Sequence, residues 1–354
     1  MRLLLFLLLS IQTFACQVPV FRYALERWQA DPFRLQLISN GPPPELTQIP
    51  THLNLEFESL DLTQLTSAQQ FAIVGLDQIT EYPAFLLHPP ESWQNPAPLV
   101  FPASESSLQK ILDSPARQRI KADLLAGQST VWVLIEGRDQ SANDATFQQL
   151  EQTLKEAQSQ IKIPEGIIQA NQVGKVGADI SLDDVLRSTI PLKISFKIER
   201  IKRDDSAEQA FLRILTANRL APPEEPLVVP IFGRGRTPGP LLGSSITPEA
   251  ILTACEYLCG ACSCQVKSGN PGYDLLFQAH WQKNLQSGLI VIDKQLPSIL
   301  PTLNEESSPP DPPESSRHQS ALNTYFIPIS PILIAAVIVL TLIIGTILIM
   351  RKSS

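Results

Sequence analysis

The stretch TVWVLIEGRDQSAND, residues 130–144, predicts a buried β-strand that passes through a short turn into a helix. β-branched, aromatic and aliphatic residues fill the first six positions, which is typical of a strand covered on both faces. Apolar residues then recur at helical spacing: Phe147, Leu150, Leu154 and Ala157. A strand followed at once by an amphipathic helix begins an α/β arrangement.

The chain continues to alternate strands with helices. Residues 192–201 (LKISFKIERI) alternate apolar with polar positions, which predicts a strand with one protected face. A second amphipathic helix is expected over residues 207–215, and residues 226–232 (PLVVPIF) predict another buried strand. For the last helix, Thr247 is the expected cap, Pro248 the first residue and Gly260 the left-handed terminator.

This order of elements over residues 129–264, with a short strand before the last helix, resembles the thioredoxin fold (βαβαββα). Pro226 stands just before the third strand, where thioredoxin-like proteins place a cis proline beside the active site. The resemblance implies a groove beside Pro226 that holds a peptide or a partner protein. The family's reactive CxxC follows its first strand, but here that position reads GRDQSAND, with Arg138 and Asp139 and no cysteine. Dithiol exchange at that place is therefore excluded.

The N-terminal half, residues 16–127, predicts an α/β domain that we interpret as a degenerate copy of the same fold. It offers a helix over residues 20–28, a strand over residues 33–38 and a proline-led strand over residues 82–88. Residues 104–125 predict helix, interrupted near Ser114 and Pro115. The thioredoxin-like domain, with a cysteine-rich C-terminal extension, is expected over residues 128–295.

The two ends of the chain predict export and a membrane anchor. Arg2 precedes a short apolar run and a small residue at Ala15, the layout of a signal peptide over residues 1–15. Residues 327–350 contain the uncharged run PILIAAVIVLTLIIGTILIM, long enough to cross a bilayer, followed by a basic tail at residues 351–354. Residues 296–326 are rich in Pro and Ser and predict a stalk. We therefore expect a single-pass inner-membrane protein with its soluble part on the periplasmic side.

The charge balance argues against nucleic acid as a partner. The chain carries 28 Lys and Arg against 35 Asp and Glu, a net charge of −7. No block of basic residues stands out from this acidic background.

The five cysteines predict disulfides more than metal or redox chemistry. Cys255, Cys259, Cys262 and Cys264 form a CxxxCxxCxC segment that, in an oxidising compartment, favours structural disulfides. Zinc is the lesser alternative, and CxxxCxxC also spaces the cluster ligands of radical S-adenosylmethionine enzymes, although the late helix and the export signal argue against that chemistry. Cys262 and Cys264 are the redox candidates. Cys16 is a candidate lipidation site, although Thr13 and Phe14 depart from the lipoprotein pattern and equally allow cleavage after Ala15.

Two arginines are candidate contacts for an anion or a partner. Arg234 and Arg236 follow the Pro226 strand on a glycine-rich turn, where two guanidinium groups could bind a carboxylate or a phosphate. Pairing with nearby acidic residues is the alternative. The histidines show no paired spacing, and no GxSxG or nucleotide-binding pattern is present.

Three segments, CQVPVFRYALERW, PIFGRGR and CGACSCQVKSGNPGYDLL, are similar to segments of a group of exported, membrane-anchored bacterial proteins, a resemblance that implies no mechanism. The function expected is that of a binding or assembly module without a cofactor, rather than an enzyme. The alternative is a membrane-tethered thiol-disulfide oxidoreductase that uses the segment from Cys255 to Cys264.

Overall fold

The computed structural model describes residues 17–46, 49–50, 52–93, 97–169, 172, 181–216 and 225–286. All of these belong to one compact unit, residues 1–293, and the second unit, residues 294–354, lies outside the described part of the chain. Cys16, the signal peptide, the stalk and the predicted transmembrane run also lie outside it. None of the helices in the described ranges combines the length and the apolar character needed to cross a membrane.

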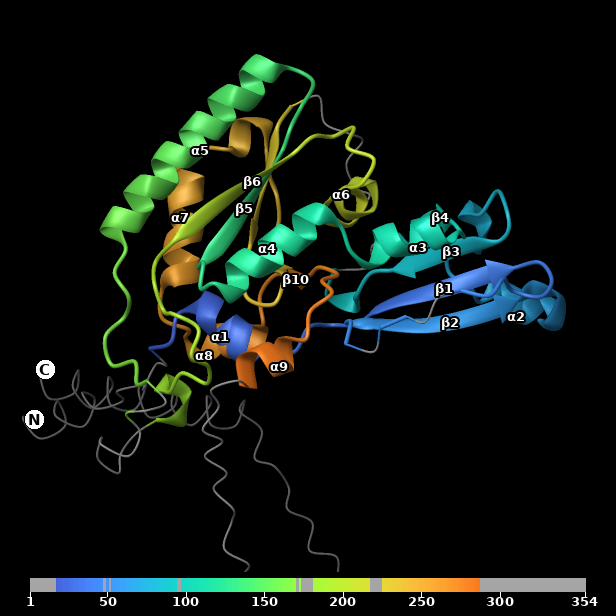
Figure 1. Ribbon diagram of the computed structural model, residues 1–354, viewed down its shortest axis with the longest axis horizontal. Helices are drawn as coiled ribbons and strands as arrows, with labels where there is room; N and C mark the ends of the chain where they lie inside the picture. The colour runs from blue at the N-terminus through green and yellow to red at the C-terminus, as the bar shows by residue number, and fades with distance from the viewer. Residues whose placement is uncertain are drawn as a thin grey trace, which may run out of the picture. The chain divides into compact units, whose positions relative to one another are not determined.

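The described chain is a mixed α/β protein built on two four-stranded mixed sheets (Figure 1). The first sheet has the order β2-β1-β3-β4, and its strands are β1 (Phe33–Ser39), β2 (Leu55–Asp61), β3 (Ala84–His88) and β4 (Leu99–Pro102). The second has the order β6-β5-β7-β9, and its strands are β5 (Thr130–Ile135), β6 (Phe196–Ile201), β7 (Leu227–Ile231) and β9 (Leu241–Leu242).

The two sheets share one topology. In each, the first two strands in the chain are parallel, the third is antiparallel to the first, and the fourth is antiparallel to the third. The register places Ile38 opposite Ala84 in the first sheet and Ile135 opposite Leu227 in the second. In both sheets, therefore, the residue after the proline lies beside the carboxyl end of the central strand.

Helices cover both faces of the second sheet. They are α4 (Pro115–Leu125) and α6 (Gln209–Leu215) on one face, and α5 (Gln140–Gln160) and α7 (Pro248–Cys259) on the other. Alternate residues of β5 divide between the faces: Val131 and Val133 pack toward α4 and α6, while Trp132 and Leu134 pack toward α5 and α7. This alternation explains why every residue of β5 is buried.

The expected order of strands and helices over residues 129–264 is confirmed, with two local corrections. The strand expected from Leu192 begins only at Phe196, because Ser129 Oγ donates to Lys193 O (2.8 Å) and accepts from Ser195 N (3.0 Å) just before pairing begins. Gly260 follows α7 with φ of −74°, so the predicted left-handed turn is wrong. Glycine is needed there for another reason: an added Cβ would lie 2.8 Å from Glu256 O.

The described ranges of the N-terminal half contribute three further α-helices. α1 (Val20–Glu26) packs against α7 and the turn after β7, and α3 (Glu105–Leu112) covers one face of the first sheet. The interruption near Ser114 is confirmed: Ser114 Oγ accepts from Arg117 N and Pro115 begins α4. The short helix α2 (Ser67–Phe71) lies at the outer end of the first sheet (Figure 1).

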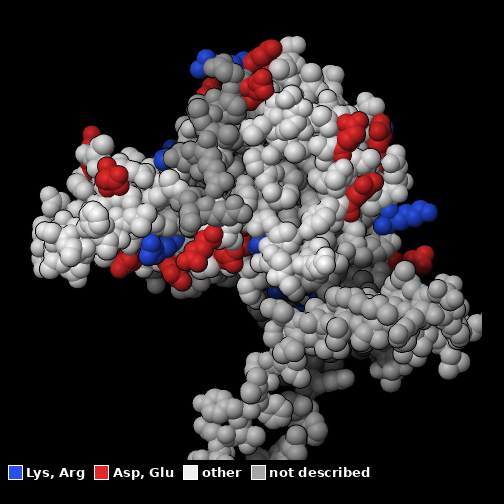
Figure 2. Space-filling view, turned by 180° about the vertical axis from the view of Figure 1, so that it is seen from behind, with Lys and Arg blue, Asp and Glu red and all other residues white. Residues whose placement is uncertain are grey.

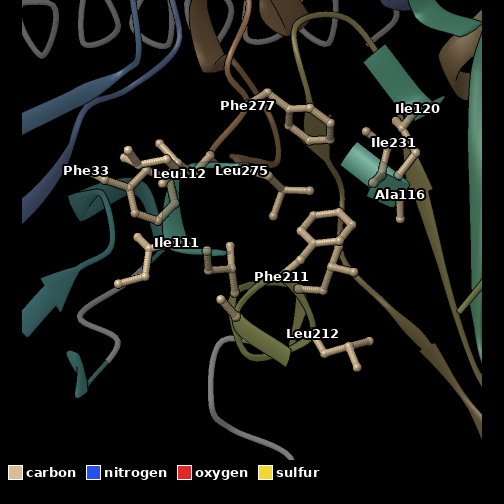
Figure 3. Packing of buried hydrophobic residues seen from close by; sticks show 14 of the residues in the cluster. Phe33, Ile111, Leu112, Ala116, Ile120, Phe211, Leu212, Ile231, Leu275 and Phe277 are labelled. Carbon is tan, nitrogen blue, oxygen red and sulfur yellow. The ribbon is translucent and has the colours of Figure 1, made fainter. Parts of the chain in front are cut away.

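One hydrophobic core joins the two halves (Figure 3). Phe33 and Ile111 enter it from the first sheet and α3, and Ile231 enters from the second sheet. Phe211 lies between them, with its ring 5.8 Å from the ring of Phe277 in an edge-on contact. Aromatic pairs of this kind add to the stabilisation from burial.

Candidate functional site

Ion pairs occupy the carboxyl end of β5, where the thioredoxin resemblance implies a groove. Arg200 contacts Glu136 (2.6 Å) and Asp144 (2.9 Å), which ties β6 to the turn after β5 and to α5. Arg203 donates to Glu136 O (3.1 Å) and Glu225 O (3.4 Å). These side chains hold together the three segments that meet at this edge.

The residues predicted at this edge have structural roles. Pro226 is buried directly before β7. Asp139 is the cap of α5, since its carboxylate accepts from Ser141 N (2.9 Å), and Arg138 lies in the turn before it. Side-chain contacts therefore connect the segments at the edge beside Pro226, and they occupy the place where the resemblance implies a groove.

The four described cysteines differ sharply in exposure. Cys255 and Cys259 are fully buried on α7, Cys262 is buried in the following turn, and Cys264 is exposed as the first residue of α8 (Cys264–Gly269). Burial raises the pKa of the Cys255 thiol far above its usual range, and it raises the pKa of Cys259 to about 12. Neither of these two thiols can supply thiolate near neutral pH.

The cysteine segment shows no metal centre within the described ranges. No set of three His, Cys, Asp or Glu side chains there is placed to hold an ion. The structure joins none of the four described cysteines to one another by a disulfide, so the pairing expected from the compartment stays a prediction.

The two arginines predicted as partner contacts bind distant backbone. Arg234 donates to Leu25 O (2.8 Å) and Glu26 O (3.3 Å) at the end of α1. Arg236 pairs with Asp274 and also donates to Pro271 O (2.9 Å). Both residues are more than nine-tenths buried. Arg236 is committed to holding the segment around β10 (Tyr273–Asp274), whereas Arg234 also lines a pocket.

Exposed apolar side chains gather at the outer end of the first sheet. In the segment between β2 and β3, Phe71 is 93 % exposed, Val74 64 % and Tyr82 41 %. Tyr82 precedes Pro83, which is itself exposed, and the Tyr82–Pro83 bond is cis. We call Phe71, Val74, Tyr82 and Pro83 the apolar tip. Large apolar side chains left in water at one end of a sheet mark a binding surface more often than chance.

Buried apolar residues support the apolar tip. Ile73 and Leu76 pack against a cluster that includes Ile38 and Leu86 of the sheet, so the segment itself is anchored while its neighbours Phe71 and Val74 are exposed. Thr66 and Gln69 form a reciprocal capping box at the start of α2. Figure 2 shows mostly uncharged side chains at this end of the sheet, with a few acidic ones beside them.

Sequence reasoning missed the apolar tip. Phe71, Val74 and Tyr82 follow no helical or strand periodicity, and an isolated apolar residue ordinarily predicts core. The proline-led strand at Tyr82 was the one signal that pointed to this place.

Comparisons with known proteins add nothing on function, so the function is inferred from the geometry. No family model, no curated protein and no solved structure matches the chain.

Proposed function

We propose that the protein is a membrane-anchored, periplasmic binding or assembly module made of two thioredoxin-like halves without a CxxC site. In this proposal the apolar tip of the first half binds a protein partner. The membrane anchor and the export signal rest on the sequence at residues 331–350 and 1–15.

Strand topology supports the thioredoxin-like part of the proposal. Both sheets have the same strand order and directions, and in both a proline stands just before the third strand. The second half also has all the helices of the βαβαββα pattern, whereas residues 40–54 of the first half join β1 to β2 without a described helix. The shared strand order of the two halves, with more helices of the pattern described in the second half, supports an ancestral duplication.

The observation that carries the binding role is the exposure of Phe71, Val74 and Tyr82. Burying a side chain of this size on a partner contributes roughly 1.5–3 kcal/mol for each residue. Aromatic side chains also dominate the energetics of protein interfaces. The equivalent edge of the second half is closed by Arg200 and Arg203, so the first half offers the more accessible surface.

Site-directed photo-crosslinking in the producing cells would test this proposal. A benzophenone amino acid at position 71 should yield a discrete adduct, because the side chain there is exposed in the apolar tip. The matched control is the same amino acid at Gln152, which is exposed on α5 far along the chain. Val74→Ser with Tyr82→Ser should remove the adduct at position 71 without lowering the melting temperature.

Two results would reject the binding role. One is equal cross-linking at positions 71 and 152. The other is an adduct at position 71 that persists when Val74 and Tyr82 are both serine.

The alternative function, a thiol-disulfide oxidoreductase, is favoured by the exposure of Cys264 two residues from Cys262. In such an enzyme the Cys264 thiolate would attack a substrate disulfide, and a second thiol would resolve the mixed disulfide. Cys264→Ser would then abolish exchange with a disulfide substrate, while the apolar-tip variant would leave it intact. The binding role predicts instead that Cys264→Ser keeps the adduct at position 71, whereas the apolar-tip variant loses it.

A further inference from the structure

A pocket of about 450 Å³ opens between the N-terminal half and the end of the described chain. It is lined by the segment after α1, the segment before β2, the turn after β7, and α9 (Trp281–Gln286) with the two residues before it. Its residues are Gln29, Ala30, His52, Leu53, Asn54, Arg234, Ala279, His280, Trp281 and Lys283. A volume of this size is in the range of small-molecule sites.

Cationic groups line the pocket, and its described lining includes no carboxylate. Arg234 and Lys283 supply two fixed positive charges, although the protein as a whole is acidic with a net charge of −7. The nearest acidic groups that act on Arg234, Glu26 and Asp274, are ion-paired with Arg22 and Arg236 respectively. The positive charges of Arg234 and Lys283 at this pocket therefore favour the binding of an anionic ligand.

The Arg234 guanidinium is preorganised for such a ligand. Three of its five N–H groups donate to Leu25 O, Glu26 O and Gln29 Oε1, the last at 3.3 Å. These bonds fix the plane of the guanidinium and account for one N–H on each nitrogen, so that, among the residues the structure describes, one N–H on each terminal nitrogen is left for an acceptor. A fixed guanidinium loses little entropy when it binds an oxyanion.

Two stacked histidines form another wall. The rings of His52 and His280 lie 3.6 Å apart at an angle of 26°. Burial first, and then the nearby His280 and Lys121, lower the pKa of His52. An anion beside this stacked pair would oppose that effect and favour protonation of His52.

We propose that this pocket binds a small organic anion. Its carboxylate or phosphate group is held by Arg234, Lys283 and the paired histidines. Its apolar part lies against Leu53 and Trp281, which line the same pocket. By linkage, such a ligand binds more tightly as the pH falls and His52 takes up a proton. This site is separate from the apolar tip and does not depend on the function proposed for it.

Titration of the full-length protein in detergent would test the site with phenylacetate, phenyl phosphate and the neutral isostere phenylacetamide. Binding is followed by calorimetry and by the NMR shifts of the His52 and His280 ring nitrogens. At pH 6 at least one anion should bind about 10-fold more tightly than the amide, equivalent to about 1.4 kcal/mol. That preference should fall several-fold by pH 8, and the relative affinities of the two anions distinguish a carboxylate site from a phosphate site.

Variants locate the effect in the pocket. Lys283→Met should weaken binding of the anion at least about threefold, because one cation is lost at an exposed position where folding is not at risk. Lys155→Met, on the exposed face of α5, is the matched control and should change nothing. His52→Phe keeps a stacked ring and should flatten the pH dependence.

The proposal is overturned if neither anion saturates the protein below about 10 mM at pH 6, an affinity weaker than about −3 kcal/mol. It is also overturned if phenylacetamide binds as tightly as the anions, or if Lys283→Met and Lys155→Met behave alike.

Discussion

Arg22 and Glu26 stand one turn apart on α1 and form a fully buried ion pair, with Nε 2.8 Å from Oε1. Glu26 also accepts from Ser188 N (3.0 Å) and Arg187 N (2.7 Å). Arg22 donates to Ile190 O (2.7 Å), so the pair fastens a segment more than 160 residues away in the chain. This clamp connects α1 of the first half to the segment that leads into β6 of the second.

Removal of one partner of this pair should be strongly destabilising. Arg22→Met removes the closer of the two cations that pair with the buried Glu26 carboxylate and leaves Arg27 at 3.4 Å, so we expect a loss of about 3 kcal/mol in the free energy of unfolding, the lower end of the range for a broken buried pair. Urea unfolding of the full-length protein measures this change in the free energy of unfolding. Arg119→Ala is the control, since Arg119 pairs with Glu199 through a side chain that is 56 % exposed, and its loss should cost less than about 1 kcal/mol. Similar losses for both variants would contradict a special role for the buried pair.

His88 should make the stability depend on pH. Its Nε2 lies 2.8 Å from Gln36 Oε1 on the first sheet. Burial first, and then the neighbouring Arg34 charge, lower the pKa of His88 to about 4. Between about pH 6.5 and pH 4, His88 is therefore protonated in the unfolded chain and neutral in the folded chain. The free energy of unfolding falls as the pH drops through this range.

The size of this pH effect is limited by exposure. A shift of this size corresponds to at most about 3 kcal/mol, and we expect about 1–2 kcal/mol because the ring is only half-buried and solvent screens it. His88→Gln should be less sensitive to acid by that amount when unfolding is compared at pH 4.5 and pH 7. An unchanged difference between the two pH values would show that His88 does not carry the effect.

The fold was predictable where the core imposes a clear pattern. The strand at Thr130, the helix with Leu150 and Leu154 and the strand at Leu227 are all buried on regular faces, and all were predicted. The edge strand β2 was missed because Glu56 to Ser59 are exposed on both faces, which leaves no apolar period to detect. α2 has five residues, too few for a helical period.

The candidate site was less predictable because exposure is a property of the folded chain. Phe71 has the composition of a core residue, and only the fold reveals that it is in water. Arg234 and Arg236 were predicted as functional cations, yet much of their bonding is to carbonyl groups supplied by remote segments such as Leu25 and Pro271. The stacking of His52 on His280 joins positions 228 residues apart, which no local pattern indicates.

Thiol reactivity should follow burial along the cysteine segment. Cys264 is exposed, so iodoacetamide at pH 8 should modify it first in the reduced, folded protein. Cys255 and Cys259 should remain unmodified until the protein unfolds, because both are fully buried and burial raises the pKa of each thiol. Peptide mapping after timed alkylation measures the order, with urea-unfolded protein as the control for intrinsic reactivity. Modification of Cys255 as fast as Cys264 would mean that α7 opens readily.

The start of the described chain runs antiparallel to the turn between α7 and α8, and this pairing leads to a prediction for Cys16. Pro19 pairs with Ala261, Val20 N donates to Gly260 O (3.0 Å) and Cys262 N donates to Val18 O (3.0 Å). Cys16 stands two residues before Val18 in the sequence, and Cys262 and Cys264 lie in and directly after the segment that pairs with Val18 and Pro19.

We therefore expect Cys16 to form a disulfide with Cys262 or Cys264 in the exported protein. The two thiols lose two electrons and two protons to the disulfide of an exchange partner in that oxidising compartment. Tryptic mapping without reduction should find the peptide of residues 16–22 linked to the peptide of residues 237–267, and Cys16→Ser should release one thiol at Cys262 or Cys264. Acylation of Cys16 would block the bond, since its sulfur would already be a thioether. An acyl mass on the N-terminal peptide, or full alkylation of Cys16 before reduction, would contradict this expectation and favour the lipid-anchored alternative or a free thiol, respectively.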